Sequence, residues 1–253
     1  MKKAIFLITI FSTLLINSQS NNAYKSGEWL RFNISYSGLI KAGEATLKLK
    51  SNTESYNVKA VGKSTGALKW FFKVEDFYES YFSKETGLPR KFKRKINEGG
   101  YTKNLIIEFD QILKKAKVNN IKKNTIEEFK IKDSVQDMLS VFYHLRNNYD
   151  IDSIHEEEDF AVNMFFDSEN YEFKMKFLGI ETINTKFGKI KCIKSRPFVQ
   201  SGRVFKEKES LTLWISADKN KIPIKIKADL VVGSIVVNLD AFSGLNHPFE
   251  IKF

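Results

Sequence analysis

Few of the residues that could carry out chemistry are spaced as a reaction would need them. Histidine occurs at three distant positions, 144, 155 and 247, and Cys192 is the single cysteine. No glycine-rich phosphate loop, H-E-x-x-H or Cys-x-x-Cys pattern occurs. Acids are adjacent at Glu75/Asp76 and Glu127/Glu128, but a catalytic carboxylate pair is defined by its separation in space. The sequence therefore does not support an enzyme, and no cofactor is expected. A hydrolase is a distant third hypothesis, after a binding module and a structural or interaction protein.

The run from His155 to Asp159 contains residue types that bind metals. Consecutive positions on a loop do not fix a coordination geometry, and the other two histidines are distant in sequence. We therefore expect no metal site. Cys192 lies in the alternating run GKIKCIKS, which predicts a strand, and it has neither a cysteine partner nor a histidine nearby. A buried structural thiol is the expectation.

Residues 70–82 are unusual because seven of these 13 positions are aromatic. Side chains alternate across a strand, so consecutive aromatics cannot all face one side of a sheet. Some must face a second layer, a cavity or solvent. Core packing is one interpretation, and the wall of an apolar ligand site or a docking patch is the other. The aromatic residues are Trp70, Phe71, Phe72, Phe77, Tyr78, Tyr81 and Phe82.

Two arginines stand at positions that predict inward-facing side chains. Arg94 alternates with Lys91, Lys93 and Lys95, and these lysines predict a solvated strand face opposite Arg94. An inward guanidinium needs a carboxylate, a carbonyl or a bound anion. Arg146 follows a helical apolar stripe and could pair with a buried acid or with carbonyls at the helix end. Alanine at either arginine is expected to cost more stability than alanine at Lys91 or Lys93.

Strands must position most of these residues, because apolar and polar residues alternate with period two along much of the chain. About a dozen such runs predict antiparallel strands. Residues 111–132 have weak periodicity, which predicts a short strand and an exposed loop. The predicted fold is all-β and mainly antiparallel, with a curled sheet that is barrel-like or two-layered and one packed helix.

The helix is predicted over residues 133–148. Asp133 and Gln136 have the form of a capping box, and an apolar stripe with helical spacing follows them. Asp137, Ser140 and His144 fall on the side opposite that stripe.

Four stretches resemble the bacterial domain-of-unknown-function family 3108. They are GEWLRFNISYSGLIKAGEATLKL at 27–49, GLPRKFKR at 87–94, QDMLSVFYHLR at 136–146 and LWISADKNKIPIKIKADLVVGSI at 213–235. The resemblance spans nearly the whole chain after its N-terminal segment. It implies an exported, β-rich envelope protein, and it supplies no catalytic residue.

The N-terminus has the form of a secretory signal peptide. Lys2 and Lys3 precede the apolar run Ala4 to Ile16, and small residues follow at 18–20. That run is shorter than the roughly 20 residues that span a bilayer. We predict that residues 1–20 are removed, leaving one β-rich domain over 21–253 in the periplasm or secreted. No cysteine lies near the cleavage site, so no lipid anchor is expected, and no transmembrane span remains.

The charge favours anionic partners. The full chain carries +11, and removal of Lys2 and Lys3 leaves +9. Export argues against nucleic acid, so lipid head groups or an anionic envelope polymer fit better. The alternative is that lysines solubilise the outer strand faces, since they are spread along the chain.

The sequence predicts an exported envelope protein that binds an apolar or amphiphilic anionic ligand, a lipid or an envelope glycan, without catalysis. The alternative is a structural or interaction protein that docks another envelope protein through an aromatic patch. The candidate ligand-binding residues are Trp70, Phe71, Phe72, Phe77, Tyr78, Tyr81, Arg94 and Arg146.

Overall fold

The structure is a computed structural model, and it describes residues 22–66, 68–148, 159–198 and 210–251. The predicted signal peptide lies outside the described residues, as does the acidic run at 155–158.

The described residues form two helices and fourteen strands. The helices are α1 (Leu68–Phe71) and α2 (Ser140–Asn148). The strands are β1 (Trp29–Tyr36), β2 (Ile40–Ser51), β3 (Ser55–Ser64), β4 (Glu75–Ser83), β5 (Pro89–Glu98), β6 (Tyr101–Asp110), β7 (Lys115–Asn120), β8 (Thr125–Lys130), β9 (Asp159–Phe166), β10 (Glu169–Thr185), β11 (Gly188–Pro197), β12 (Leu211–Ser216), β13 (Pro223–Asp229) and β14 (Ser234–Ser243).

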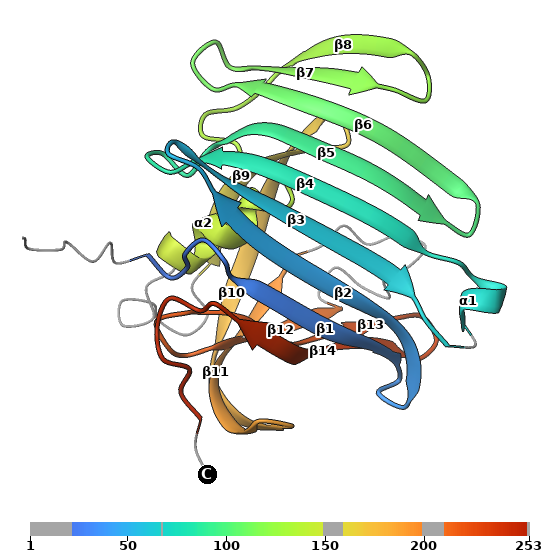
Figure 1. Cartoon of the computed structure of the whole chain (residues 1–253), viewed down its shortest axis with the longest axis vertical. Coiled ribbons are helices and arrows are strands. Elements are labelled where there is room, and N and C mark those ends of the chain that lie inside the picture. The colour runs from blue at the N-terminus through green and yellow to red at the C-terminus, as the bar shows by residue number, and fades with distance from the viewer. Residues whose placement is uncertain (1–21, 67, 149–158, 199–209, 252–253) are drawn as a thin grey trace, which may run out of the picture.

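Within the described residues, these strands form one 14-stranded antiparallel sheet whose order nearly follows the chain. Strands β1 to β8 are consecutive neighbours, as are β9 to β14, and β1 pairs with β14 to join the two runs. Strands β8 and β9 are the two edges, so the sheet curls without closing (Figure 1). The predicted fold class, a curled antiparallel sheet with one packed helix, is confirmed.

Residues 111–132 differ from the prediction because they contain a hairpin of two strands, β7 and β8. Strand β8 is a sheet edge, and nearly all its side chains are exposed. A strand that faces water on both sides needs no apolar face and so carries no period-two signal. The charged residues of β8, Glu127, Glu128 and Lys130, suit an edge strand, since charge there discourages pairing with other chains.

The chain between β8 and α2 runs beside the other edge of the sheet. The Gln136 N–H donates to the Asn163 carbonyl at 2.8 Å, and the Phe165 N–H donates to the Gln136 carbonyl at 3.0 Å. The Asn170 side chain donates to the Lys130 carbonyl at 2.9 Å. These bonds cover part of the β9 edge and hold the β9–β10 hairpin near the end of β8.

The predicted helix is present, but it begins at Ser140 rather than at Asp133. The Asp137 carboxylate caps it by accepting hydrogen bonds at 2.8 Å from the N–H groups of Leu139 and Ser140. Gln136 pairs with β9 instead, and Ser134 has a φ of 54°, outside the helical range. Asp137 and Ser140 are fully buried, although they lie on the side opposite the predicted apolar stripe.

Helix α2 joins the two largest apolar clusters. The first cluster lies between β2–β7 and α2, and it includes the stacked rings of Phe82 and Tyr143 at 5.5 Å. The second gathers side chains of β1, β11–β14 and the C-terminal tail. Phe142 packs against both clusters. The helix is therefore fixed by burial on the sheet, which stabilises helices more than intrinsic propensity does.

Candidate functional site

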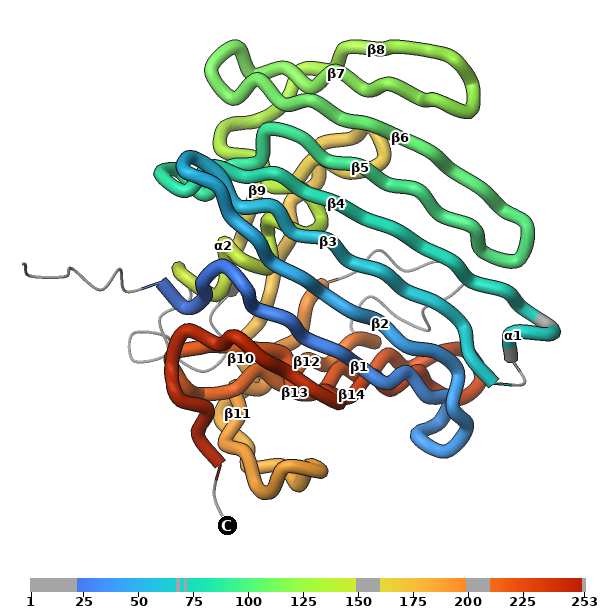
Figure 2. Tube along the Cα trace, in the orientation of Figure 1, coloured from blue at the N-terminus to red at the C-terminus, as the bar shows by residue number. Residues whose placement is uncertain are grey.

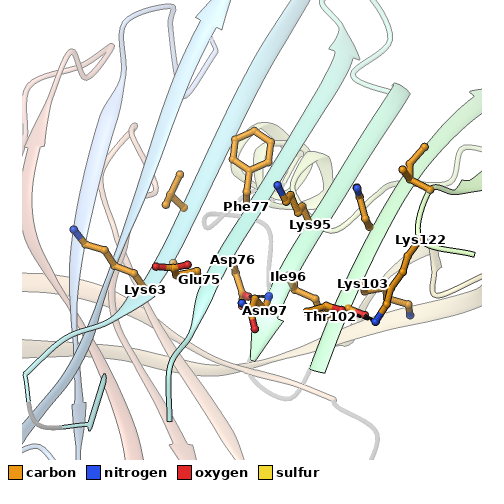
Figure 3. Close-up of a pocket in the computed structure, with 14 residues that line it drawn as sticks. Lys63, Glu75, Asp76, Phe77, Lys95, Ile96, Asn97, Thr102, Lys103 and Lys122 are labelled. Carbon is orange, nitrogen blue, oxygen red and sulfur yellow. Dashed lines mark hydrogen bonds between the residues drawn. The ribbon is translucent and has the colours of Figure 1, made fainter. Parts of the chain in front are cut away.

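A groove of about 820 Å³ lies along neighbouring strands β3, β4, β5 and β6 and reaches the turn after β7 (Figure 3). Its apolar lining comes from Val61, Phe77, Ile96 and Ile121. Its cationic lining comes from Lys63, Lys95 and Lys122, while Lys103 borders it but pairs its ammonium with Asp167. The remaining polar lining includes Glu75, Asp76, Asn97, Thr102 and Asn104. The volume lies in the usual range for small-molecule sites.

Strand register brings these side chains together. Val61 is directly opposite Phe77, Phe77 is opposite Lys95, and Lys95 is opposite Asn104. Directly opposed residues share a face of an antiparallel sheet, so four strands each contribute one member to a single row. The Ile121 N–H donates to the Asn104 carbonyl at 3.0 Å, which places Ile121 at the end of this row. An aromatic ring and an ammonium group therefore lie next to each other, as Figure 3 shows.

The two sides of the groove differ in charge. On the β4 side, Glu75 pairs with Lys73 at 3.0 Å. Across the groove, the Lys122 ammonium donates to the Thr102 hydroxyl at 2.5 Å. Lys95 is exposed and forms no ion pair with a carboxylate of the described residues. The β5–β7 side is therefore the more cationic one.

The aromatic segment does not act as one surface. Trp70 is 89% exposed, Phe72 is 47% exposed, and Phe77 is half-buried in the groove lining. Tyr78 stacks on Phe92 in the first core cluster, with ring centroids 6.4 Å apart. The Tyr81 hydroxyl donates to Glu79 at 3.0 Å. The Phe71 side chain lies outside the described residues. Of the described aromatic side chains predicted to bind ligand, Phe77 alone lines this groove.

Arg94 makes the inward polar contact that its spacing predicts. Its guanidinium pairs with Asp167 in the β9–β10 turn and lies 4.8 Å from the Phe166 ring centroid. The Lys103 ammonium reaches the same carboxylate at 2.6 Å. These contacts tie the β9–β10 turn to β5 and β6. Arg94 itself does not line the groove.

Arg146 also makes inward polar contacts, and all of them are structural. Its guanidinium donates to both Glu28 oxygens, at 2.6 and 2.7 Å. It also donates to the Asn220 carbonyl at 2.9 Å and to the Ala23 carbonyl at 3.1 Å. The Arg146 and Glu28 side chains are only 2% and 1% exposed. Arg146 therefore clamps the N-terminal segment, α2 and the β12–β13 turn together, away from the groove lining.

The lysine face of β5 is not uniformly solvated as predicted. Lys91 pairs with the exposed Glu108 at 3.0 Å, but Lys93 pairs at 2.8 Å with Glu79, whose side chain is 4% exposed. Burial alone would raise the pKa of Glu79. Hydrogen bonds from Lys93, Tyr81, Asn57 and Lys59 outweigh it and lower the pKa to about 2. Cross-strand acids on β4 and β6 decide this difference, so it is not visible in the lysine spacing.

The sequence Gly62-Lys63-Ser64-Thr65-Gly66 has the spacing of a hydrolase nucleophile elbow, but its serine is not arranged as a nucleophile. Ser64 is buried, and its hydroxyl accepts a hydrogen bond from the Val74 N–H at 2.9 Å. The described histidines, His144 and His247, bond to other groups. A serine nucleophile needs a base within hydrogen-bond reach.

Two further groups with chemical potential are enclosed in the core. Burial raises the pKa of Asp137 to about 6, and Ser80, also fully buried, donates to its carboxylate at 2.5 Å. Burial raises the pKa of Cys192 to about 12, so the thiol stays neutral. The predicted buried structural thiol is confirmed. Among the described residues, no three His, Cys, Asp or Glu side chains are grouped to hold a metal ion.

The groove lysines were missed by sequence reasoning. Lys63 lies on β3 and Lys122 in the β7–β8 turn, far apart in a lysine-rich chain. Only the strand order brings them to one place. The single local signal was Lys95, which alternates with Arg94 on a predicted strand.

The curled sheet, the packed helix and the open groove define a barrel-like antiparallel β protein. The family described as protein of unknown function (DUF3108) matches residues 31–240, and the chain belongs to that family. The resemblance seen in the sequence is thereby confirmed.

Solved structures with the same kind of fold share little sequence with this chain. A beta-barrel-like protein of domain of unknown function DUF1849 from Brucella abortus has a TM-score of 0.59 at 9% identity. The alignment covers 88% of this chain and 100% of that one, so the similarity shows the fold alone.

Two weaker similarities are to proteins of Bacteroides fragilis and Parabacteroides distasonis. One, from Bacteroides fragilis, is provisionally described as an exported protein with a YmcC-like fold (TM-score 0.33, 9% identity, 87% of this chain and 97% of that chain). The other, from Parabacteroides distasonis, is provisionally described as a lipoprotein (TM-score 0.31, 11% identity, 88% and 98%). Both are too distant to support an argument about this chain.

A comparison with curated proteins found no match. In the part of the chain that the structure describes, neither helix has the length and apolar character needed to cross a membrane.

Proposed function

We propose that this protein is a non-catalytic binding module of the bacterial envelope whose β3–β6 groove holds an amphiphile with an anionic head group. The observation that carries the proposal is the row in which Val61 and Phe77 lie beside Lys95, with Ile121 at its end. Two apolar side chains adjoin one ammonium group there. An amphiphile needs that combination, while a purely apolar or purely anionic ligand would use only half of it.

The tail of the ligand belongs over Val61 and Phe77, and the head group belongs on the β5–β7 side. Glu75 on the opposite side would repel an anion, and its own charge is met by Lys73. Lys95 is available, since it has no carboxylate partner among the described residues. Burying about 200–300 Å² of tail would contribute about 5–8 kcal/mol before the cost of association, consistent with micromolar binding at best.

The test is titration of purified protein with a monomeric anionic amphiphile, dodecyl phosphate below its micelle concentration, followed by calorimetry. Lys95→Glu should weaken binding about tenfold or more, because it replaces attraction at the head group with repulsion. Lys50→Glu on β2 is the matched control, since Lys50 is exposed and lies outside the groove. Dodecyltrimethylammonium, with the same tail and the opposite charge, should bind more weakly than dodecyl phosphate.

Equal weakening by Lys95→Glu and Lys50→Glu would show a general charge effect and would remove the groove from the proposal. No binding of dodecyl phosphate by the wild-type protein would favour the alternative function, docking of another envelope protein. That docking would use the exposed aromatic side chains of Trp70 and Phe72, 89% and 47% exposed.

A further inference from the structure

The loops at one end of the curled sheet expose large apolar side chains. Leu39 and Trp70 are each 89% exposed, and Val231 and Val232 are 70% and 74% exposed. They lie in the β1–β2 turn, in α1 and in the β13–β14 turn. Figure 2 shows the β1–β2 turn, α1 and the β5–β6 turn together at the right-hand end of the trace. Side chains of this size exposed on adjacent loops indicate an interaction surface.

Hydrogen bonds join these loops to one another. The Ser37 N–H donates to the Ser234 carbonyl at 2.7 Å, which links the β1–β2 turn to the start of β14. The Thr65 N–H donates to the Ala42 carbonyl at 3.0 Å, which links the segment before α1 to β2. The exposed side chains therefore belong to one continuous loop surface.

The shape of the turns holds these side chains outward. The Tyr36 hydroxyl donates to the Val232 carbonyl at 3.1 Å. Gly233 has a φ of 72°, and a Cβ there would lie 2.4 Å from the Tyr36 hydroxyl, so only glycine lets the ring lie against the turn. Gly99 similarly leaves room for the Phe72 ring, where a Cβ would come within 2.3 Å. The loops are thus built before any partner binds, which lowers the entropy cost of binding.

Exposed lysines lie at the same end of the sheet as the apolar tips. Lys41 follows Leu39 and Ile40, Lys69 precedes Trp70, and Lys123 lies in the β7–β8 turn. Lys41 is partly neutralised by Glu44 at 2.9 Å. Lys69 and Lys123 form no ion pair with a carboxylate of the described residues. The surface therefore combines separated apolar points with positive charge.

This pattern fits a lipid surface better than a protein. The apolar side chains are on separate loops, and lysines lie at the same end of the sheet, so a protein partner would need a separate pocket for each one. A fluid bilayer accepts scattered apolar tips between its head groups while lysines meet the phosphates. Tryptophan is favoured at that depth because its ring is amphipathic.

We infer that this end of the sheet docks on an anionic lipid bilayer, with Leu39, Trp70, Val231 and Val232 entering the head-group region. The inference goes beyond the proposed function, because these four residues do not line the groove. The groove shares the β7–β8 turn with this surface through Ile121 and Lys122. A bilayer docked there could also supply the amphiphile that the groove holds, and this last point rests on the proposed function.

The experiment is sedimentation with vesicles of phosphatidylcholine containing phosphatidylglycerol, compared with phosphatidylcholine alone. The test variant is Leu39→Ser with Val232→Ser, which removes one apolar tip from each of two loops. The matched control is Ile112→Ser with Leu113→Ser in the β6–β7 turn at the opposite end, where these residues are 91% and 67% exposed. The test variant should lower vesicle affinity at least about tenfold, since each tip loses its apolar burial.

The control variant should bind the mixed vesicles as the wild-type protein does, and binding to phosphatidylcholine alone should be at least about tenfold weaker. Trp70 should be quenched by brominated lipid, with Trp70→Phe giving the background from Trp29 and Trp214. Equal loss of vesicle affinity in the test and control variants would overturn the inference. So would wild-type affinity that does not depend on phosphatidylglycerol. Absence of vesicle binding by the wild-type protein would also overturn it and would favour a protein partner for this surface.

The two proposals fail separately. The Leu39→Ser, Val232→Ser variant should still bind monomeric dodecyl phosphate, because neither residue lines the groove. Vesicle binding without dodecyl phosphate binding would leave docking standing and reject the groove. The reverse result would reject docking and leave the groove standing.

Discussion

Arg146 forms four hydrogen bonds with groups that have almost no access to water. Two go to the Glu28 carboxylate, one to the Asn220 carbonyl and one to the Ala23 carbonyl. In Arg146→Ala, the carboxylate and both carbonyls would stay buried without this donor. Breaking a buried ion pair by removing one partner costs about 3–5 kcal/mol, and each abandoned carbonyl adds about 1 kcal/mol. We expect a loss of about 5–7 kcal/mol.

Urea unfolding monitored by circular dichroism measures this loss. With a slope of about 2–3 kcal/mol/M for a domain of this size, the midpoint should fall by about 1.7–3.5 M. Lys91→Ala is the control, because Lys91 and Glu108 form an exposed pair worth about 0–1 kcal/mol. Arg94→Ala should fall between them, since Asp167 is 41% exposed and keeps Lys103.

Lys93→Ala should cost more than Lys91→Ala, because Lys93 pairs with the nearly buried Glu79. The cost should stay below that of Arg146→Ala, because Glu79 keeps hydrogen bonds from Asn57 and Tyr81. The ranking of the four variants thus follows how much water reaches the abandoned partner.

A second comparison separates lost charge pairing from lost packing. Arg146→Met leaves Glu28 buried and unpaired, whereas Arg146→Met combined with Glu28→Met removes both charges. The double variant should therefore be more stable than the single one. A shift for Arg146→Ala no larger than that for Lys91→Ala, or a double variant less stable than the single, would refute the reasoning.

Two other expectations can be checked directly. Burial raises the pKa of Asp137 to about 6. The folded chain therefore binds this proton more tightly than the unfolded chain, and the carboxyl's contribution to stability falls as pH rises from about 4 to about 6. Asp137→Asn should gain stability relative to wild type over that interval, measured by urea midpoints at pH 4 and pH 7, and a constant difference would contradict it. Removal of residues 1–20 should give an exported protein that begins near Asn21, and N-terminal mass spectrometry that finds Met1 would disprove cleavage.

Much of the fold follows from local pattern. Period-two alternation in segments such as 29–36 and 55–64 predicts strands, because one face of each must be buried and the other wetted. The same rule predicts that residues 70–82 cannot bury all their aromatics, and Phe82 is in the core while Trp70 is exposed. Strand β8 escaped the rule because an edge strand wetted on both faces needs no alternation.

The helix start shows where local pattern fails. Asp133 and Gln136 have capping chemistry, but Gln136 pairs with β9, and Asp137 takes the cap. Backbone pairing with a distant strand competes with local helix formation. The sequence around Asp133 does not indicate that β9 lies beside it.

The sequence also indicated that Arg146 needs a buried acid or carbonyls, because an inward guanidinium cannot stay unpaired. It could not identify Glu28, which lies 118 residues away. The sequence could not identify the groove either, because Val61, Phe77 and Lys95 become neighbours only through strand register. Residue alternation is a local property set by the strand itself. Which strands become neighbours depends on the curl of the whole sheet, including the pairing of β1 with β14, so partners and site were decided by tertiary structure.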